Sequence, residues 1–151
     1  MAVVEKSVLI ECPAAQMFEL VDRVEDYPKF LPWCGGTEII ERTPDKTVAR
    51  VHIHYRGVKS LFSTENAKEY PTLMGMKLIE GPFSQLDGCW RFRPLGDNAC
   101  KVEFHLHYEF SSKLLEKVVG PVFNHIASTF VEAFVKRAGA MGPGGRDSGV
   151  R

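Results

Sequence analysis

The longest periodic stretch of the chain runs from Ser111 to Ala138. Apolar side chains recur there in steps of three and four positions, the spacing that places them on one face of a helix: Leu115, Val119, Val122, Ile126, Phe130 and Phe134. Two serines at its start suit a helix N-cap, and two cations followed by Gly139 suit a C-terminus. Gly120 and Pro121 predict a bend but no break. The sequence therefore predicts a long amphipathic helix that needs an apolar partner.

The preceding part of the chain, from Thr37 to Phe110, carries strand patterns instead. We expect six strands in an antiparallel meander, separated by turn residues, at 37–42, 47–56, 58–69, 72–80, 83–94 and 99–110. The alternation is clearest in the last segment, where one face carries Val102, Phe104, Leu106, Tyr108 and Phe110. One face of the predicted sheet is therefore apolar, and the long helix has the apolar face large enough to cover it.

The N-terminal part adds one strand and two short helices. Residues 3–11 mix β-branched and polar side chains and predict a strand, while residues 13–21 and 24–30 predict short helices. The expected fold class is α+β. A seven-stranded antiparallel sheet wraps on the long C-terminal helix, and the two short helices lie between the first and second strands.

Composition narrows the classes of function. The 151 residues include nineteen basic and nineteen acidic side chains and have a formal net charge of zero, so no global field attracts DNA. The length suits one domain with one sizeable core. The N-terminal segment lacks a charged leader with an apolar core, and no uninterrupted apolar run is long enough to span a membrane. We expect a cytoplasmic protein without a DNA partner.

Two features suggest a pocket. Residues 27–34 hold an aromatic cluster interspersed with two prolines, which either caps the core or forms the mouth of a pocket. In the strand 58–69, Thr64 and Asn66 share the inward face with Phe62. Buried polar groups need hydrogen-bond partners, so these two side chains either touch water near a sheet edge or meet the oxygen atoms of a ligand.

Signatures of metal binding and catalysis are weak. His52 with His54, and His105 with His107, lie two apart on predicted strands, but both pairs point outward and no nearby cysteine or paired carboxylates complete a ligand set. The four cysteines lack the close spacing of a zinc site. The sequence also contains no phosphate-binding glycine loop, GxSxG elbow or local catalytic cysteine signature. We therefore expect no metal site and no enzyme activity.

The order of the predicted elements resembles the START-like helix-grip superfamily (SRPBCC, START/Bet v-like). The motifs that carry the resemblance are the run from Val24 to Cys34, with its YPKFLPWC segment, and Gly81-Pro82-Phe83 leading to Leu86, Gly88, Trp90 and Phe92. Within the superfamily, the sequence is similar to the coenzyme Q-binding branch, which also contains the ribosome-association toxin RatA. The resemblance implies a lipid-binding domain over residues 1–138. The Gly-rich tail, 139–151, is expected to be disordered.

The resemblance implies a hydrophobic cavity between sheet and helix that binds ubiquinone or a similar isoprenoid lipid in support of respiratory electron transport. It implies no required cofactor and a transient, peripheral contact with the inner membrane. The donors expected to meet the carbonyl oxygens of the quinone are Thr64, Asn66, Tyr55 and Tyr108. The full set expected to line the cavity is Tyr27, Phe30, Trp33, Tyr55, Phe62, Thr64, Asn66, Met74, Met76, Trp90, Phe92, Tyr108, Val119, Val122, Ile126 and Phe130.

Two alternatives stay open, because one fold supports several functions. The same resemblance carries a second function, in which the protein binds the large ribosomal subunit and blocks subunit association. An outward basic stripe that includes Arg91 and Arg93 favours RNA, although glutamates interleave with it. The weaker alternative is a polyketide cyclase-like enzyme, for which acid–base residues would have to meet in the cavity.

Overall fold

The computed structural model describes residues 2–141 of the chain. Seven strands and three helical segments follow one another in the described part. They are β1 (Ala2–Ile10), α1 (Ala14–Asp22), the 3₁₀ helix η1 (Val24–Lys29), β2 (Cys34–Thr43), β3 (Lys46–Tyr55), β4 (Val58–Glu69), β5 (Leu73–Glu80), β6 (Phe83–Pro94), β7 (Cys100–Phe110) and α2 (Lys113–Met141).

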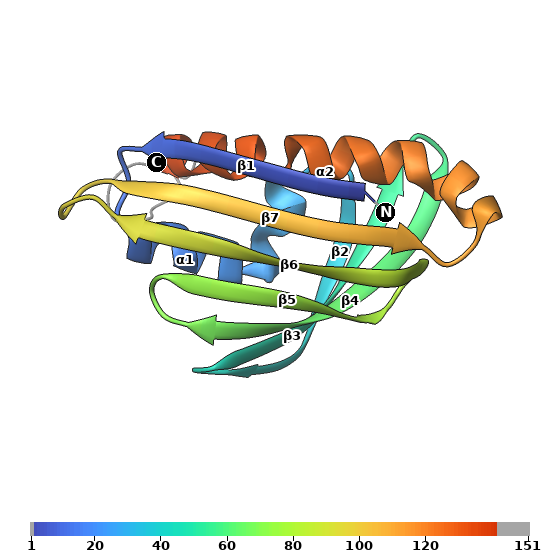
Figure 1. Cartoon of the computed structure of the whole chain (residues 1–151), viewed down its shortest axis with the longest axis horizontal. Coiled ribbons are helices and arrows are strands. Elements are labelled where there is room, and N and C mark those ends of the chain that lie inside the picture. The colour runs from blue at the N-terminus through green and yellow to red at the C-terminus, as the bar shows by residue number, and fades with distance from the viewer. Residues whose placement is uncertain (1, 142–151) are drawn as a thin grey trace.

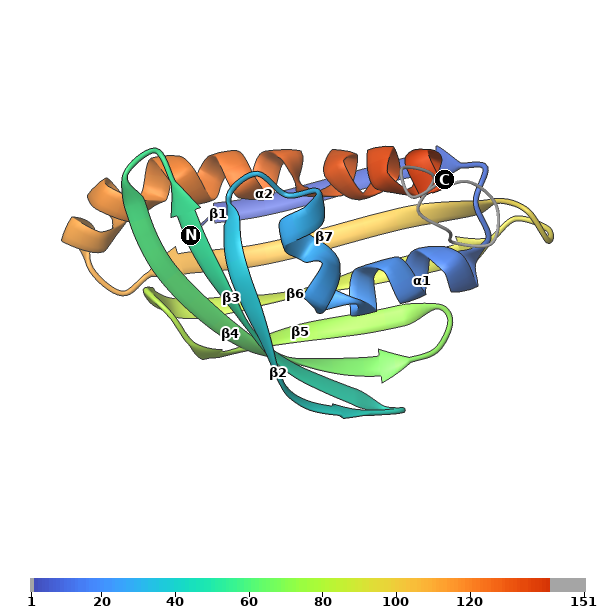
Figure 2. The same ribbon diagram turned by 180° about the vertical axis from the view of Figure 1, so that it is seen from behind.

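The seven strands form one antiparallel sheet in the order β1-β7-β6-β5-β4-β3-β2. Figure 1 shows the sheet curving under α2, which runs beside β1 along nearly the full length of the molecule. Figure 2, from behind, shows α1 and η1 between β2 and the C-terminal half of α2. The expected α+β helix-grip architecture is confirmed, including the two short helices between the first and second strands.

The long helix follows its sequence signals closely. The Ser112 hydroxyl accepts a hydrogen bond from the backbone N–H of Leu115 at 3.1 Å, the N-cap arrangement that the serines predict. The helix continues through Pro121 without a break. It ends at Met141, three residues beyond the predicted end, so Gly139 lies inside it. The rest of the expected tail, residues 142–151, lies outside the described residues.

The core lies between α2 and the concave face of the sheet. Trp90, Phe92 and Phe134 have no exposed surface, and the Trp90 and Phe134 rings meet edge to face with centroids 5.3 Å apart. By length and composition α2 is long and apolar enough to cross a membrane, although polar residues interrupt its apolar run in the sequence. In this structure 44% of its most apolar window is buried in the fold, where α2 packs on the sheet.

A polar network ties the α1–η1 segment to the sheet. The Asp22 carboxylate accepts hydrogen bonds from Thr47 Oγ1 at 2.8 Å and from Lys68 Nζ at 3.1 Å, and the Lys68 side chain is only 5% exposed. Nearby, the Arg42 guanidinium forms two 2.8 Å hydrogen bonds with the Glu25 carboxylate. Because a buried lysine needs a paired anion, the network holds the end of α1 against β3 and β4.

Two neighbouring strands approach unusually closely at Gly88. A Cβ atom there would lie 2.3 Å from the His105 carbonyl oxygen and 3.1 Å from the Leu106 Cα atom. Gly88 pairs with Leu106 in the register of β6 and β7. The absence of a side chain therefore sets the spacing of these strands, whose residues Leu86 and Leu106 face inward.

Acid stability should depend on the Arg42–Glu25 pair. Its hydrogen bonds lower the pKa of Glu25 to about 2. A depressed carboxylate pKa stabilises the fold above the unfolded value of about 4.3, and this contribution is lost as the pH falls from there toward 2. Because Glu25 is half-exposed, Arg42→Gln should cost only about 1 kcal/mol at pH 7, by urea unfolding, and almost nothing at pH 2. A difference that stays constant across this range would contradict the assignment.

Gly88→Ala should destabilise the protein by about 2 to 3 kcal/mol, because the added methyl group meets backbone atoms that cannot move without parting the strands. Gly75→Ala is the matched control, since nothing lies within 4 Å of the equivalent Cβ position on β5. Its cost should stay below about 1 kcal/mol. Urea unfolding of both variants measures the difference, and equal costs would exclude the close approach as the cause.

Candidate functional site

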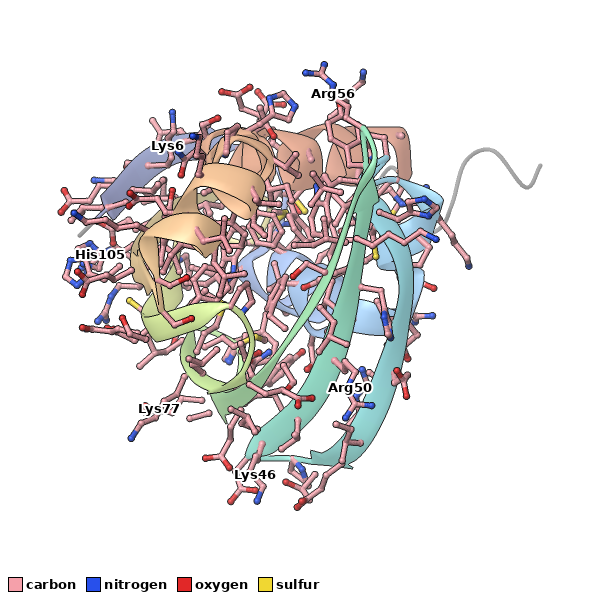
Figure 3. All side chains as sticks on the ribbon, turned by 90° about the vertical axis from the view of Figure 1, so that its right-hand side faces the viewer. Lys6, Lys46, Arg50, Arg56, Lys77 and His105 are labelled. Carbon is pink, nitrogen blue, oxygen red and sulfur yellow. The ribbon has the colours of Figure 1, made fainter. Side chains whose placement is uncertain are left out.

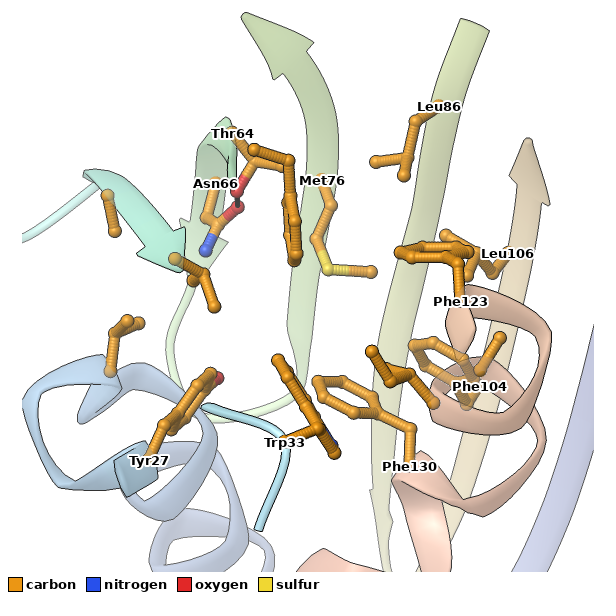
Figure 4. Close-up of a pocket in the computed structure, with 16 residues that line it drawn as sticks. Tyr27, Trp33, Thr64, Asn66, Met76, Leu86, Phe104, Leu106, Phe123 and Phe130 are labelled. Atoms are coloured by element: carbon orange, nitrogen blue, oxygen red, sulfur yellow. Dashed lines mark hydrogen bonds between the residues drawn. The ribbon is translucent and has the colours of Figure 1, made fainter. Parts of the chain in front are cut away.

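A cavity of about 60 Å³ lies between α2, η1 and the concave face of the sheet. Figure 4 shows side chains from the sheet, from η1 and from α2 around it. It is lined by Val24, Tyr27, Trp33, Ala49, Val51, Phe62, Thr64, Asn66, Met76, Leu86, Phe104, Leu106, Phe123, Ile126, Ala127 and Phe130.

The walls of the cavity are largely apolar, and six of the sixteen lining residues are aromatic. The rings of Trp33 and Phe130 lie 6.2 Å apart, and those of Phe104 and Phe130 lie 5.7 Å apart. On the side toward the start of α2, Phe62 meets Phe123 edge to face at 6.0 Å. Such rings offer apolar contact surface with little loss of conformational entropy, which suits an apolar or aromatic ligand.

A single polar pair interrupts these walls. Thr64 Oγ1 donates a 2.8 Å hydrogen bond to Asn66 Oδ1, and both residues are less than 8% exposed. They belong to β4, which lies between β3 and β5, so the interpretation of a water-exposed sheet edge is wrong. Among the described residues the amide nitrogen of Asn66 has no hydrogen-bond partner, and Figure 4 shows it turned toward the cavity. The pair can therefore donate to an acceptor oxygen of a ligand.

The remaining side-chain oxygen among the residues that line the cavity belongs to Tyr27. Its hydroxyl donates a 2.6 Å hydrogen bond to the Val21 carbonyl oxygen, and burial raises its pKa far above the ordinary value. It therefore stays neutral and engaged with the backbone. No carboxylate, histidine, lysine or cysteine is among the described residues that line the cavity. The chemistry available there is apolar packing and hydrogen bonding, without a pair of groups for acid–base catalysis.

The structure brings half of the expected residues to the cavity. Those that line it are Tyr27, Trp33, Phe62, Thr64, Asn66, Met76, Ile126 and Phe130. Trp90, Phe92 and Met74 face the same side of the sheet but lie in its solid part, where Phe18 of α1 and Phe134 of α2 fill the space beside them. Strand alternation gives the face of a residue but not its depth along the strand, so it could not separate the two regions.

The other expected residues have partners of their own. The Tyr55 ring stacks on His125 at 5.8 Å, and the Tyr108 hydroxyl donates a 2.5 Å hydrogen bond to Asn124 Oδ1. Neither tyrosine is therefore placed to donate to a ligand in the cavity. Phe30 lies under the guanidinium of Arg137, 5.2 Å from its ring centroid. Val119 and Val122 are buried closer to the start of α2 and do not line the cavity.

The cavity also has walls that the sequence analysis did not assign to a site: Val24, Ala49, Val51, Leu86, Phe104, Leu106, Phe123 and Ala127. A detectable signal existed for Phe123, because positions 123, 126, 127 and 130 follow the three- and four-residue steps of one helical face. Alternation along the strands also puts Val51, Leu86, Phe104 and Leu106 on the inward face. The sequence pattern does not give the rotation of α2 about its own axis, and this rotation decides which helix residues border the cavity.

Size limits what the cavity holds in this conformation. About 60 Å³ accommodates a few water molecules. Binding sites for drug-sized molecules measure about 300 to 1,000 Å³. A quinone ring with even one isoprene unit therefore requires the walls to move apart, and the α1–η1 segment and α2 are the elements that cover the sheet.

The two histidine pairs lie on the outer side of the sheet. His52 Nε2 lies 2.7 Å from Glu38 Oε1, and the Nε2 atoms of His105 and His107 lie 2.8 Å apart. Within residues 2–141, no group of three or more histidine, cysteine or acidic side chains is arranged to hold a metal ion. The four cysteines in this range are free thiols, three of them buried.

Comparison with known proteins places this geometry in a family. The family of polyketide cyclase/dehydrase and lipid transport proteins matches residues 10–135. The ribosome association toxin RatA of Escherichia coli K12 is 41% identical over 135 residues, which cover 89% of this chain and 85% of RatA. The mitochondrial coenzyme Q-binding protein COQ10 homolog B of Xenopus laevis is 26% identical over 130 residues, covering 83% of this chain and 53% of that protein.

A START superfamily protein from Mycobacterium smegmatis shares the fold, with a TM-score of 0.69, 22% identity and coverage of 92% of this chain and 98% of that one. The expected START-like superfamily is confirmed by this structure together with the sequence relatives. The extent of the sequence match identifies the family, whose description includes both enzymes and lipid carriers. The chain belongs to the polyketide cyclase/dehydrase and lipid transport family, with the START-like helix-grip fold and with relatives named RatA and COQ10.

Proposed function

We propose that the protein acts as a ribosome-association toxin of the RatA type, which binds the large ribosomal subunit and blocks subunit association. The observation that carries the proposal is the 41% identity with RatA over 89% of this chain. This likeness spans the whole fold and exceeds the 26% identity with the COQ10 homologue. The ribosomal function therefore becomes the first candidate, and quinone binding, which the sequence motifs favoured, becomes the second.

The outer face of β6 and β7 is the surface with which we associate this activity. It carries Arg91, Arg93 and Lys101, with His105 nearby, and Figure 3 shows His105 on the same side of the molecule as Lys6. Glu103 forms ion pairs with Arg93 and Lys101, whereas Arg91 has no ion pair within residues 2–141. Arg91 lies opposite Glu103 in the register of β6 and β7 but forms no ion pair with it, so its guanidinium can contact a phosphate of ribosomal RNA.

A second candidate function is the binding of ubiquinone or a similar isoprenoid lipid. The cavity favours it, because apolar aromatic walls with one donor pair match an apolar ligand that carries carbonyl oxygens. Each buried isoprene unit contributes on the order of 4 kcal/mol before ordering costs. The two functions use different surfaces, so one protein can carry both.

The ribosomal function predicts binding to purified large subunits that weakens with salt. Arg91→Glu with Arg93→Glu should lower the affinity at least about tenfold, because two phosphate contacts are replaced by repulsion. Lys29→Glu with Lys136→Glu is the control, since both lysines are exposed and belong to η1 and α2. Co-sedimentation measures both pairs. Wild-type protein that fails to sediment with large subunits at low salt would refute the proposal.

The lipid function predicts that Thr64→Val with Asn66→Leu weakens ubiquinone binding roughly ten- to a hundredfold, because the donors to a quinone carbonyl are lost while the apolar walls remain. Thr37→Val with Asn98→Leu makes the same changes away from the cavity and should leave the Kd unchanged. Quenching of Trp33 and Trp90 fluorescence by a short-chain ubiquinone gives the Kd. Undiminished binding by the cavity variant would remove these two residues from the site.

A further inference from the structure

An exposed apolar strip lies at the start of α2. Leu114 is 70% exposed and Val118 is 53% exposed, although the rest of the helix buries its large apolar residues against the sheet. Leu114, Val118 and Pro121 follow the four- and three-residue steps of one helical face, and all three face solvent. Nothing within the described residues covers this face.

The hairpin between β3 and β4 extends the strip. His125 is one helical turn beyond Pro121, and its ring stacks in parallel on Tyr55 at 5.8 Å. The Arg56 guanidinium lies over the same tyrosine, 5.0 Å from the ring centroid. Figure 3 shows Arg56 projecting from the hairpin tip. The strip therefore continues from the helix onto an aromatic stack that ends in a cation.

The backbone of the hairpin tip holds Arg56 in an unfavourable conformation. Its φ is +50°, and that of Gly57 is +80°, the combination found in tight hairpin turns that favour Asn-Gly. A residue with a Cβ atom and a long side chain is disfavoured at the first of these positions. Strain of this kind is typical of positions where a side chain has a role in binding. Here it presents a cation at the outermost point of the hairpin.

The charges around the strip are mainly positive. Lys113 and Lys117 flank the apolar residues on α2, and neither they nor Arg56 form an ion pair within residues 2–141. Many cations elsewhere are neutralised, as Arg50 is by Glu38 and Glu80. The one acidic residue in the first turn of α2 is Glu116. An apolar strip flanked by unpaired cations is complementary to a surface with an apolar interior and anionic headgroups.

We propose that this end of the molecule docks on an anionic lipid bilayer. Leu114, Val118 and Pro121 enter the interfacial region, while Lys113, Lys117 and Arg56 contact the headgroups. Three apolar side chains are too few for a stable protein partner, which requires about 800 Å² on each side. They suit shallow, reversible membrane contact, in which a small apolar area and electrostatic attraction act together.

The docked orientation has a consequence for the cavity. Phe123 follows Pro121 by two residues, and its contact with Phe62 forms the cavity wall nearest this end. Docking places that wall next to the bilayer, where an isoprenoid lipid resides. This consequence rests on the second proposed function, whereas the docking itself does not.

Flotation of the full chain with phospholipid vesicles tests the proposal. Vesicles of phosphatidylcholine with about 30% phosphatidylglycerol should bind the protein, those of phosphatidylcholine alone should bind it less, and added salt should release it. Leu114→Glu with Val118→Glu should lower binding to the anionic vesicles at least about tenfold, since two carboxylates meet the negative surface. Both side chains are exposed, so the fold should persist, which thermal unfolding checks.

A matched control lies at the opposite end of the molecule. Leu9 and Leu95 are 69% and 51% exposed, close to the values for Leu114 and Val118. They lie at the end of β1 and in the turn after β6, far from the start of α2 (Figure 1). Leu9→Glu with Leu95→Glu makes the same change in charge and should bind vesicles as the wild type does.

Three outcomes would overturn the proposal: no binding to anionic vesicles, equal losses in both double variants, or undiminished binding by the α2 variant. Co-sedimentation with large ribosomal subunits is measured on the same proteins. If the α2 variant loses only ribosome binding, the strip is part of a ribosomal interface and not of a membrane surface. Vesicle binding with no ribosome binding would leave the docking intact and refute the first proposed function.

Discussion

The structure depends on one packing constraint: one long helix, α2, together with the short α1 and η1, must cover the apolar face of a seven-stranded sheet. Because α2 is narrow, the sheet curls around it. The gap between β2 and the C-terminal half of α2 is filled by α1 and η1 (Figure 2). Where aromatic rings from both layers interlock, as at Trp90 and Phe134, the core is solid. Where the curled sheet stands away from the helix, the cavity remains.

This arrangement separates stability from binding along one axis of the molecule. The solid part lies toward α1 and is tied to the sheet by the buried pair of Asp22 and Lys68. The hollow part lies against the middle of α2, from Phe123 to Phe130, and contains the Thr64–Asn66 pair. The small volume of the cavity implies that a ligand enters by displacing its walls. Part of the wall comes from the helical segments η1 and α2, whose attachment to the sheet depends on side chains, so these segments can move more easily than the hydrogen-bonded strands.

Family membership leaves the function open, because the family contains enzymes and lipid carriers and its members here include relatives named as a ribosome toxin and a quinone-binding protein. The distribution of charge provides a physical distinction between sites. The net charge is zero, and many surface cations have carboxylate partners. The cations that form no ion pair among the described residues, such as Lys113 and Lys117, therefore mark a surface where an anionic partner finds the least competition.

The sequence by itself determined the elements, the apolar face of the sheet and the N-cap of α2, because periodicity, turn residues and capping serines act on neighbours within a few residues. It also placed Thr64 and Asn66 on the inward face, since alternation along a strand is a local property. The tertiary structure decided which inward residues border empty space. Trp90 and Phe104 share a face and an aromatic character, yet only Phe104 lines the cavity. That difference comes from the curvature of the sheet and the rotation of α2, which set the distance between residues far apart in the sequence.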